Sequence, residues 1–105
     1  MPSGHLWVAT SGSSLTAIME LSENWIEQLY VAPPYFRQGY GSRLLELAQS
    51  SRWELFLWTF ETNAVARAFY ERRRFRQSGP ASTDNEEGHL ALQYRWVPQQ
   101  STGGR

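Results

Sequence analysis

A glycine-containing segment stands where an apolar strand is expected to give way to a helix. It reads Arg37-Gln38-Gly39-Tyr40-Gly41-Ser42 and follows the pair Pro33-Pro34. Because glycine has no Cβ, the backbone N–H groups of such a turn can come close to a ligand. The start of the following helix adds N–H groups without intrahelical partners and the positive end of the helix dipole. The segment therefore predicts an anion-binding site, and phosphate is the usual anion.

The spacing of the two glycines distinguishes between the phosphate-binding turns. The P-loop requires a lysine, and the chain contains none. The dinucleotide fingerprint G-x-G-x-x-G requires a third glycine, and Leu44 stands at that position. What remains is the pattern V-x-P-(x5)-G-x-G-(x2)-L-L, which runs from Val31 to Leu45.

This pattern resembles the acyl-CoA-binding segment of the GNAT superfamily of N-acetyltransferases, in which the turn holds the CoA pyrophosphate. A second segment, Asn63–Phe75, is similar to the family's helix with the pattern N-x-x-A-x-x-F-Y-(x4)-F. The two segments have the family's order and separation. Together they extend the resemblance over about two-thirds of the chain, from about Trp25 to about Trp96.

The resemblance implies an acetyl-CoA-dependent N-acetyltransferase in which an amine attacks the thioester directly, with acetyl-CoA as cosubstrate. Asn63 would face the pantetheine arm, and Tyr70 would protonate the leaving CoA thiolate. Backbone groups of the strand at residues 29–31 would pair with the pantetheine and polarise the thioester carbonyl. The implied cofactor-binding residues are Leu29, Tyr30, Val31, Arg37, Gln38, Gly39, Tyr40, Gly41, Ser42, Asn63 and Tyr70.

The general base is less well defined than the acid. The attacking amine must be neutral, so another group has to take up its proton. Glu27 lies on the strand expected beside the thioester, and Glu20 lies on the neighbouring strand. Either could act directly or through a water, and either could be a charge on a solvated sheet face, which suits Glu20 better. Glu27 and Tyr70 are therefore the predicted catalytic residues.

The chain also departs from the family pattern. Phe36 stands where Gln or Arg is common, and Arg37 and Arg74 stand where Gly is common. The strand and two helices that open a GNAT domain have no counterpart, so an N-terminally truncated core is expected. Two functions stay open: an enzyme, or a non-catalytic module that binds CoA or a protein. A homodimer whose partner supplies the missing wall of the acceptor site is also expected.

Composition limits the other possibilities. Net charge is zero, so no overall field favours nucleic acid or a membrane surface. Cysteine is absent, which excludes disulfides, thiolate zinc sites and a cysteine acyl-enzyme, and no metal is expected. Met1–Leu15 lacks the features of a signal peptide, and no run approaches the ~20 apolar residues of a membrane span. A cytoplasmic protein is the expectation.

Periodicity and turn residues define the elements that must position these groups. Trp53–Phe60 is apolar on both faces, as a central strand would be, and His89–Val97 alternates between apolar and polar residues. Asn63 is the expected N-cap of the second helix, and the first helix is expected to have an apolar stripe of Leu44, Leu45, Leu47 and Ala48.

The order β-β-β-α-β-α-β-β predicts an α/β (α+β) fold with a GNAT-like mixed sheet. Residues 1–97 are predicted to form a single acyl-CoA-binding domain, and residues 98–105 a disordered tail. The expected strands are His5–Thr10, Leu15–Leu21, Trp25–Val31, Trp53–Phe60, Phe75–Ser78 and His89–Val97, and the expected helices are Gly41–Ser51 and Asn63 to about Arg73.

Overall fold

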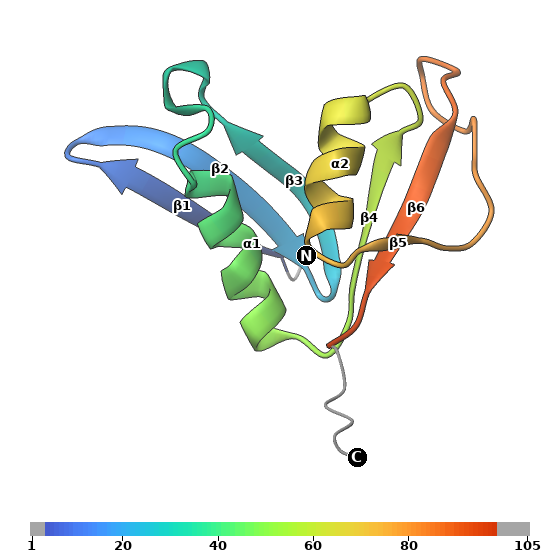
Figure 1. Ribbon diagram of the computed structural model, residues 1–105, viewed down its shortest axis with the longest axis horizontal. Helices are drawn as coiled ribbons and strands as arrows, with labels where there is room; N and C mark the ends of the chain where they lie inside the picture. Colours follow the sequence, from blue (N-terminus) through green and yellow to red (C-terminus); the bar gives the residue numbers. More distant parts are fainter. Residues whose placement is uncertain (1–3, 99–105) are drawn as a thin grey trace. The chain divides into compact units, whose positions relative to one another are not determined.

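The computed structural model describes residues 4–98, and it contains the predicted order of strands and helices with an added 3-10 turn (Figure 1). All of the predicted tail except Pro98 lies outside the described residues. Contacts divide the chain into two compact units, residues 1–55 and 56–105, and each is described by itself. The single domain over residues 1–97 stays a prediction.

The first unit contains an antiparallel meander of three strands, β1 (Gly4–Ser11), β2 (Ser14–Ser22) and β3 (Trp25–Val31). All three lie within a residue of their predicted positions. The turns between the strands contain Gly12 and Glu23, which both have positive φ. The register sets Val8 opposite Ile18, and Ile18 opposite Tyr30.

Helix α1 (Tyr40–Ser51) contacts all three strands of this meander. Its buried residues Gly41, Leu44, Leu45 and Ala48 follow the i, i+3, i+4, i+7 spacing of one helix face. Leu47 was predicted to belong to this apolar stripe, but the prediction is wrong, because its side chain is 53% exposed. The reason is geometric: at 3.6 residues per turn Leu47 lies about 110° from the centre of the face formed by the four buried residues.

The second unit contains the strands β4 (Leu55–Phe60), β5 (Arg76–Gln77) and β6 (Ala91–Trp96). Their order in the sheet is β4-β6-β5. The first residue of β4, Leu55, is the last residue of the first unit. Helix α2 (Ala64–Arg72) follows β4. Its N-cap is Asn63, as predicted. An isolated bridge between Ser82 and Ala91 ties the long β5–β6 loop to the start of β6.

Strand β4 differs from its prediction in length and in burial. Trp53 and Glu54 precede the strand, and Trp53 is 87% exposed. Burial alternates along β4, with Leu55, Leu57 and Thr59 covered and Trp58 exposed. An apolar sequence on both faces predicted a strand covered on both sides. The covering depends on neighbouring elements, which the sequence of the strand itself does not specify.

Strand β6 behaves as its alternating sequence predicted, although it begins at Ala91 rather than His89. Leu92, Tyr94 and Trp96 are buried on one face, and Arg95 is exposed. The ring centroids of Phe75 and Trp96 lie 6.4 Å apart, so Phe75, three residues after α2, is part of the same apolar core.

Candidate active site

The glycine turn of the first unit begins with a single turn of 3-10 helix at Pro33–Tyr35. The N–H of Tyr35 donates to the carbonyl of Ala32 at 2.8 Å, and the N–H of Phe36 donates to that of Pro33 at 3.2 Å. The prolines need no such partner, because proline has no N–H. The turn between β3 and α1 is therefore held by its own backbone.

Arg37 continues this turn in the left-handed region, with φ of +65°. Arg74, just after α2, has φ of +75°. These are the two positions where the family pattern commonly has glycine, and glycine is the residue that adopts positive φ without a Cβ clash. In this chain arginine occupies the same backbone conformation, at a cost of about 1 kcal/mol each.

Gly39 forms the N-cap of α1 with φ of +88°, and its carbonyl accepts from the N–H of Arg43 at 3.0 Å. Since glycine has no side chain, it cannot cap the first-turn N–H groups, and a Cβ placed there would meet no atom within 4 Å. Open space, first-turn N–H groups and the positive end of the helix dipole coincide at Gly39. This geometry suits a phosphate oxygen.

Two predicted ligand residues of this turn use their side chains to brace it. The Gln38 side-chain amide donates to the carbonyl of Pro34 at 3.1 Å. The ring of Tyr40 meets that of Tyr35 edge to face, with centroids 5.8 Å apart. Both residues therefore offer a ligand chiefly their backbone groups.

The β2–β3 register decides which backbone groups of β3 point outward. The N–H of Ala32 donates to Thr16, so alternate residues from Ala32 backward bond to β2. Tyr30 is one of these and uses its backbone in the ladder with Ile18. Leu29 and Val31 have N–H and C=O groups that point away from β2, as pairing with a pantetheine amide would require.

Glu27 lies at an irregularity in the same ladder. Glu20 pairs with Gln28 and Leu21 pairs with Ile26, which leaves Glu27 as the extra residue of a β-bulge. Bulges turn a side chain away from the regular alternation of a strand and are common beside active sites. Both Glu27 and Glu20 are exposed, but only Glu27 is at the bulge.

In the second unit, the Asn63 side-chain oxygen accepts from the N–H of Ala66 at 3.0 Å. Asn63 also lines a hollow of about 210 Å³, together with Trp58, Thr59, Phe60 and Ala91. Pockets for drug-sized ligands begin near 300 Å³. This hollow can therefore hold only a small group.

Tyr70 lies seven residues after Asn63 and so is on the same side of α2. Its ring packs edge to face against Phe69 and Phe75, with centroids 5.2 and 5.5 Å away. Burial raises the pKa of Tyr70 to about 12. The hydroxyl is therefore fully protonated at neutral pH, which a proton donor must be.

Sequence reasoning missed one polar cluster, in which Arg67 and Glu71 of α2 both hydrogen-bond to the hydroxyl of Tyr94 on β6. The spacing of Arg67 and Glu71 by four residues was the available signal, but such pairs are usual on solvated helix faces.

Among residues 4–98, no three histidine, aspartate or glutamate side chains gather as a metal site would require. In the same range, no helix has the length and apolar character needed to cross a bilayer.

Known proteins identify the family. The sequence model for the acetyltransferase (GNAT) domain matches residues 2–77. The chain therefore belongs to the GNAT superfamily.

A curated relative is the probable N-acetyltransferase Rv2775 of Mycobacterium tuberculosis (strain ATCC 25618 / H37Rv), 33% identical over 87 residues. The match covers 74% of this chain and 50% of the relative. The chain thus spans about half the length of this relative.

Solved structures agree on the fold, so the predicted GNAT-like α/β class is confirmed. Nourseothricin acetyltransferase superimposes with a TM-score of 0.79 and 25% identity, covering 91% of this chain and 66% of that one. PaiA N-acetyltransferase from Thermoplasma acidophilum, solved in complex with coenzyme A, gives a TM-score of 0.68 and 22% identity, covering 89% and 61%.

Proposed function

We propose that this chain is an acetyl-CoA-dependent N-acetyltransferase that moves an acetyl group to an amine by direct attack on the thioester. The observation that carries the proposal is the open helix start at Gly39, in a chain of the GNAT superfamily. The coenzyme A bound to the PaiA enzyme and the activity named for the mycobacterial relative support it.

The cosubstrate would be held mainly by backbone groups. First-turn N–H groups of α1, from Tyr40 to Ser42, would bind the pyrophosphate, with the exposed Arg37 adding a guanidinium. The outward groups of Leu29 and Val31 would pair with the pantetheine amides, and Asn63 would contact the same arm. Tyr30 is a weaker candidate, because its backbone already bonds to β2.

In the transfer step, the amine nitrogen forms a bond to the carbonyl carbon and the carbon–sulfur bond breaks. Tyr70 would give its proton to the departing thiolate. The leaving thiolate, whose thiol has a pKa of ~8.5, is a weaker base than the phenolate of a tyrosine whose pKa is about 12. Burial beside Tyr70 would raise the pKa of the thiol for the same reason, because both anions lose hydration. The difference between the pKa values of the thiol and of Tyr70 is therefore smaller in the site than in water.

Glu27 would take the proton that the amine loses, directly or through a water. Its place at the bulge favours it over Glu20. The cytoplasmic location stays a prediction.

Binding is tested with two glycines of matched geometry. Gly39 and Gly12 both have positive φ and open space where a Cβ would stand, so alanine should cost about 1 kcal/mol of stability at either site. Gly39→Ala should also weaken acetyl-CoA binding roughly tenfold, because the Cβ would enter the space proposed for the phosphate. Calorimetry with acetyl-CoA measures this, with Gly12→Ala as the control.

If the two variants bind acetyl-CoA with equal affinity, the turn at Gly39 does not bind the phosphate. Wild type that shows no binding and no rise in melting temperature at high acetyl-CoA would contradict the proposal altogether. Binding without acetyl transfer to any of a panel of amines would favour the non-catalytic module.

Tyr70→Phe should lower kcat about 100-fold and leave the dissociation constant of acetyl-CoA nearly unchanged. The substitution removes the proton donor and keeps the ring that packs against Phe69 and Phe75. Thiol release in single-turnover experiments is the measurement. An unaltered rate of the chemical step would show that Tyr70 is not the acid.

Glu27→Gln should lower kcat/KM at neutral pH, with partial recovery as the pH approaches the pKa of the amine. At that pH a larger fraction of the acceptor is already neutral, so a base is needed less. Glu20→Gln is the matched control on the neighbouring strand and should retain the wild-type pH profile. A similar loss in both variants would point to general electrostatics rather than to a base.

We also propose that the chain forms a homodimer through β1, the outer strand of the first unit's sheet. Leu6 and Val8 of β1 are exposed. Val8 pairs with Ile18 on β2, which pairs with Tyr30 on β3, so the three side chains form a row across the sheet. Outer strands with apolar side chains tend to be covered. Light scattering should give twice the monomer mass of 12.1 kDa at micromolar concentration, and a monomer mass at every concentration would contradict the dimer.

A further inference from the structure

Helix α2 has no fully buried residue. Its apolar residues Phe69 and Tyr70 are mostly covered but keep some exposed surface. Apolar contacts are non-directional, so partial burial of this kind does not fix the rotation of a helix about its axis. Directional contacts are needed to set that rotation.

The directional contacts come from three side chains joined by hydrogen bonds. Arg67 donates from Nε to the hydroxyl oxygen of Tyr94 at 3.0 Å, and that hydroxyl donates to Oε2 of Glu71 at 2.7 Å. Arg67 and Glu71 are one helical turn apart, so one hydroxyl on β6 anchors two successive turns of α2.

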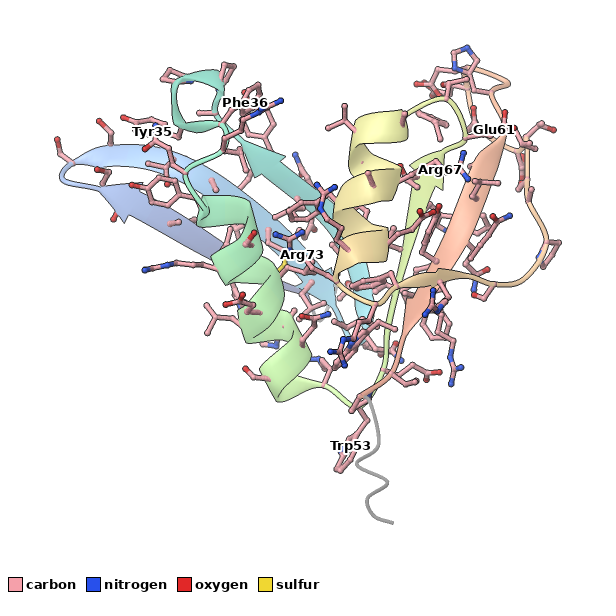
Figure 2. All side chains as sticks on the ribbon, in the orientation of Figure 1. Tyr35, Phe36, Trp53, Glu61, Arg67 and Arg73 are labelled. Carbon is pink, nitrogen blue, oxygen red and sulfur yellow. The ribbon has the colours of Figure 1, made fainter. Side chains whose placement is uncertain are left out.

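Arg67 also reaches the end of β4. Its Nη1 donates to the carbonyl of Glu61 at 3.1 Å, and Figure 2 labels both residues near the upper end of β4. The N–H of Glu61 donates in turn to the carbonyl of Leu90 at 2.8 Å, just before β6. The planar guanidinium therefore ties α2 to two points of the second unit, which a lysine ammonium could not do with fixed geometry.

The Tyr94 side chain is fully buried, and a buried hydroxyl without a partner costs about 1–3 kcal/mol. Here the hydroxyl accepts one bond and donates one, so the cluster has a single consistent arrangement of protons. The Tyr94 hydroxyl therefore depends on both Arg67 and Glu71 for its two hydrogen bonds.

We propose that Arg67, Tyr94 and Glu71 are positioning residues that set the rotation of α2 and so place Tyr70 and Asn63 for the reaction. Tyr70 directly precedes Glu71, and Asn63 stands four residues before Arg67, so both are on the helix that these contacts fix. That the cluster positions α2 does not depend on the proposed acetyl transfer. Only its effect on turnover rests on that proposed function.

The test separates helix position from turnover. The Tyr70 ring, labelled with 13C and assigned through Tyr70→Phe, is titrated by NMR in wild type, Glu71→Ala and Glu71→Gln. Wild type should titrate with a pKa of about 12. In Glu71→Ala the helix loses an anchor, and the pKa of Tyr70 should fall toward the ~10 of a hydrated tyrosine. Glu71→Gln should stay near wild type, because its amide oxygen still accepts from Tyr94.

Turnover supplies the second readout. Glu71→Ala should lower kcat about tenfold or more, because small displacements of a catalytic group have large effects on rate, and Glu71→Gln should recover most of the loss. Val65→Ala, on the same helix at an 83% exposed position, should change neither readout.

An unchanged Tyr70 titration in folded Glu71→Ala would overturn the positioning role. Failure of the Gln variant to restore the titration would do the same. If the titration moves as expected while kcat does not, the cluster positions the helix, and the acid role proposed for Tyr70 is the part that fails.

Discussion

The chain has to pass from an extended strand into a helix within the few residues between Val31 and Tyr40, and the proposed phosphate site depends on how it does so. Two residues in that segment, Arg37 and Gly39, adopt positive φ. The left-handed conformation reverses the backbone without long loops, and it leaves the first N–H groups of α1 without a capping side chain. The arginine at one of these positions shows that the backbone path is maintained even where the family's glycine is absent.

The two helices are held in different ways. Helix α1 buries four residues on one face, and its C-cap Arg52 also donates to the carbonyl of Glu23 in the β2–β3 turn at 2.7 Å. Helix α2 fully buries none, and beside the packing of Tyr70 on Phe75 it is held by the hydroxyl of Tyr94 and the guanidinium of Arg67. The helix that carries the proposed proton donor is therefore the one whose placement is governed by hydrogen-bond geometry.

Local signals in the sequence predicted much of the fold. Strand β3 was predicted with its observed bounds, because Pro33 and Pro34 end it and a polar turn precedes it. The cap at Asn63 followed from residue type and position. The predictions failed at Leu47, which lies beside the buried face of α1, and at Trp53, whose covering depends on neighbours distant in sequence.

For the candidate site, the sequence supplies the residue types but does not specify their geometry. The motif drew attention to residues 29–31 as a group, whereas the β2–β3 register decides that Leu29 and Val31, and not Tyr30, direct backbone groups outward. That register includes a bulge that no local pattern announces. The Tyr94 cluster was missed because Glu71 and Arg67 stand 23 and 27 positions before Tyr94, and only folding brings the three residues together.

That cluster also constrains how the sequence can change over evolutionary time. Replacing any one of Arg67, Glu71 and Tyr94 leaves a polar group of another without its partner, so single steps away from the trio are penalised. Compensated double or triple replacements are much less costly, because they remove donor and acceptor together. The three positions should therefore drift as a covarying unit, with epistasis between them stronger than between neighbouring residues of the same helix.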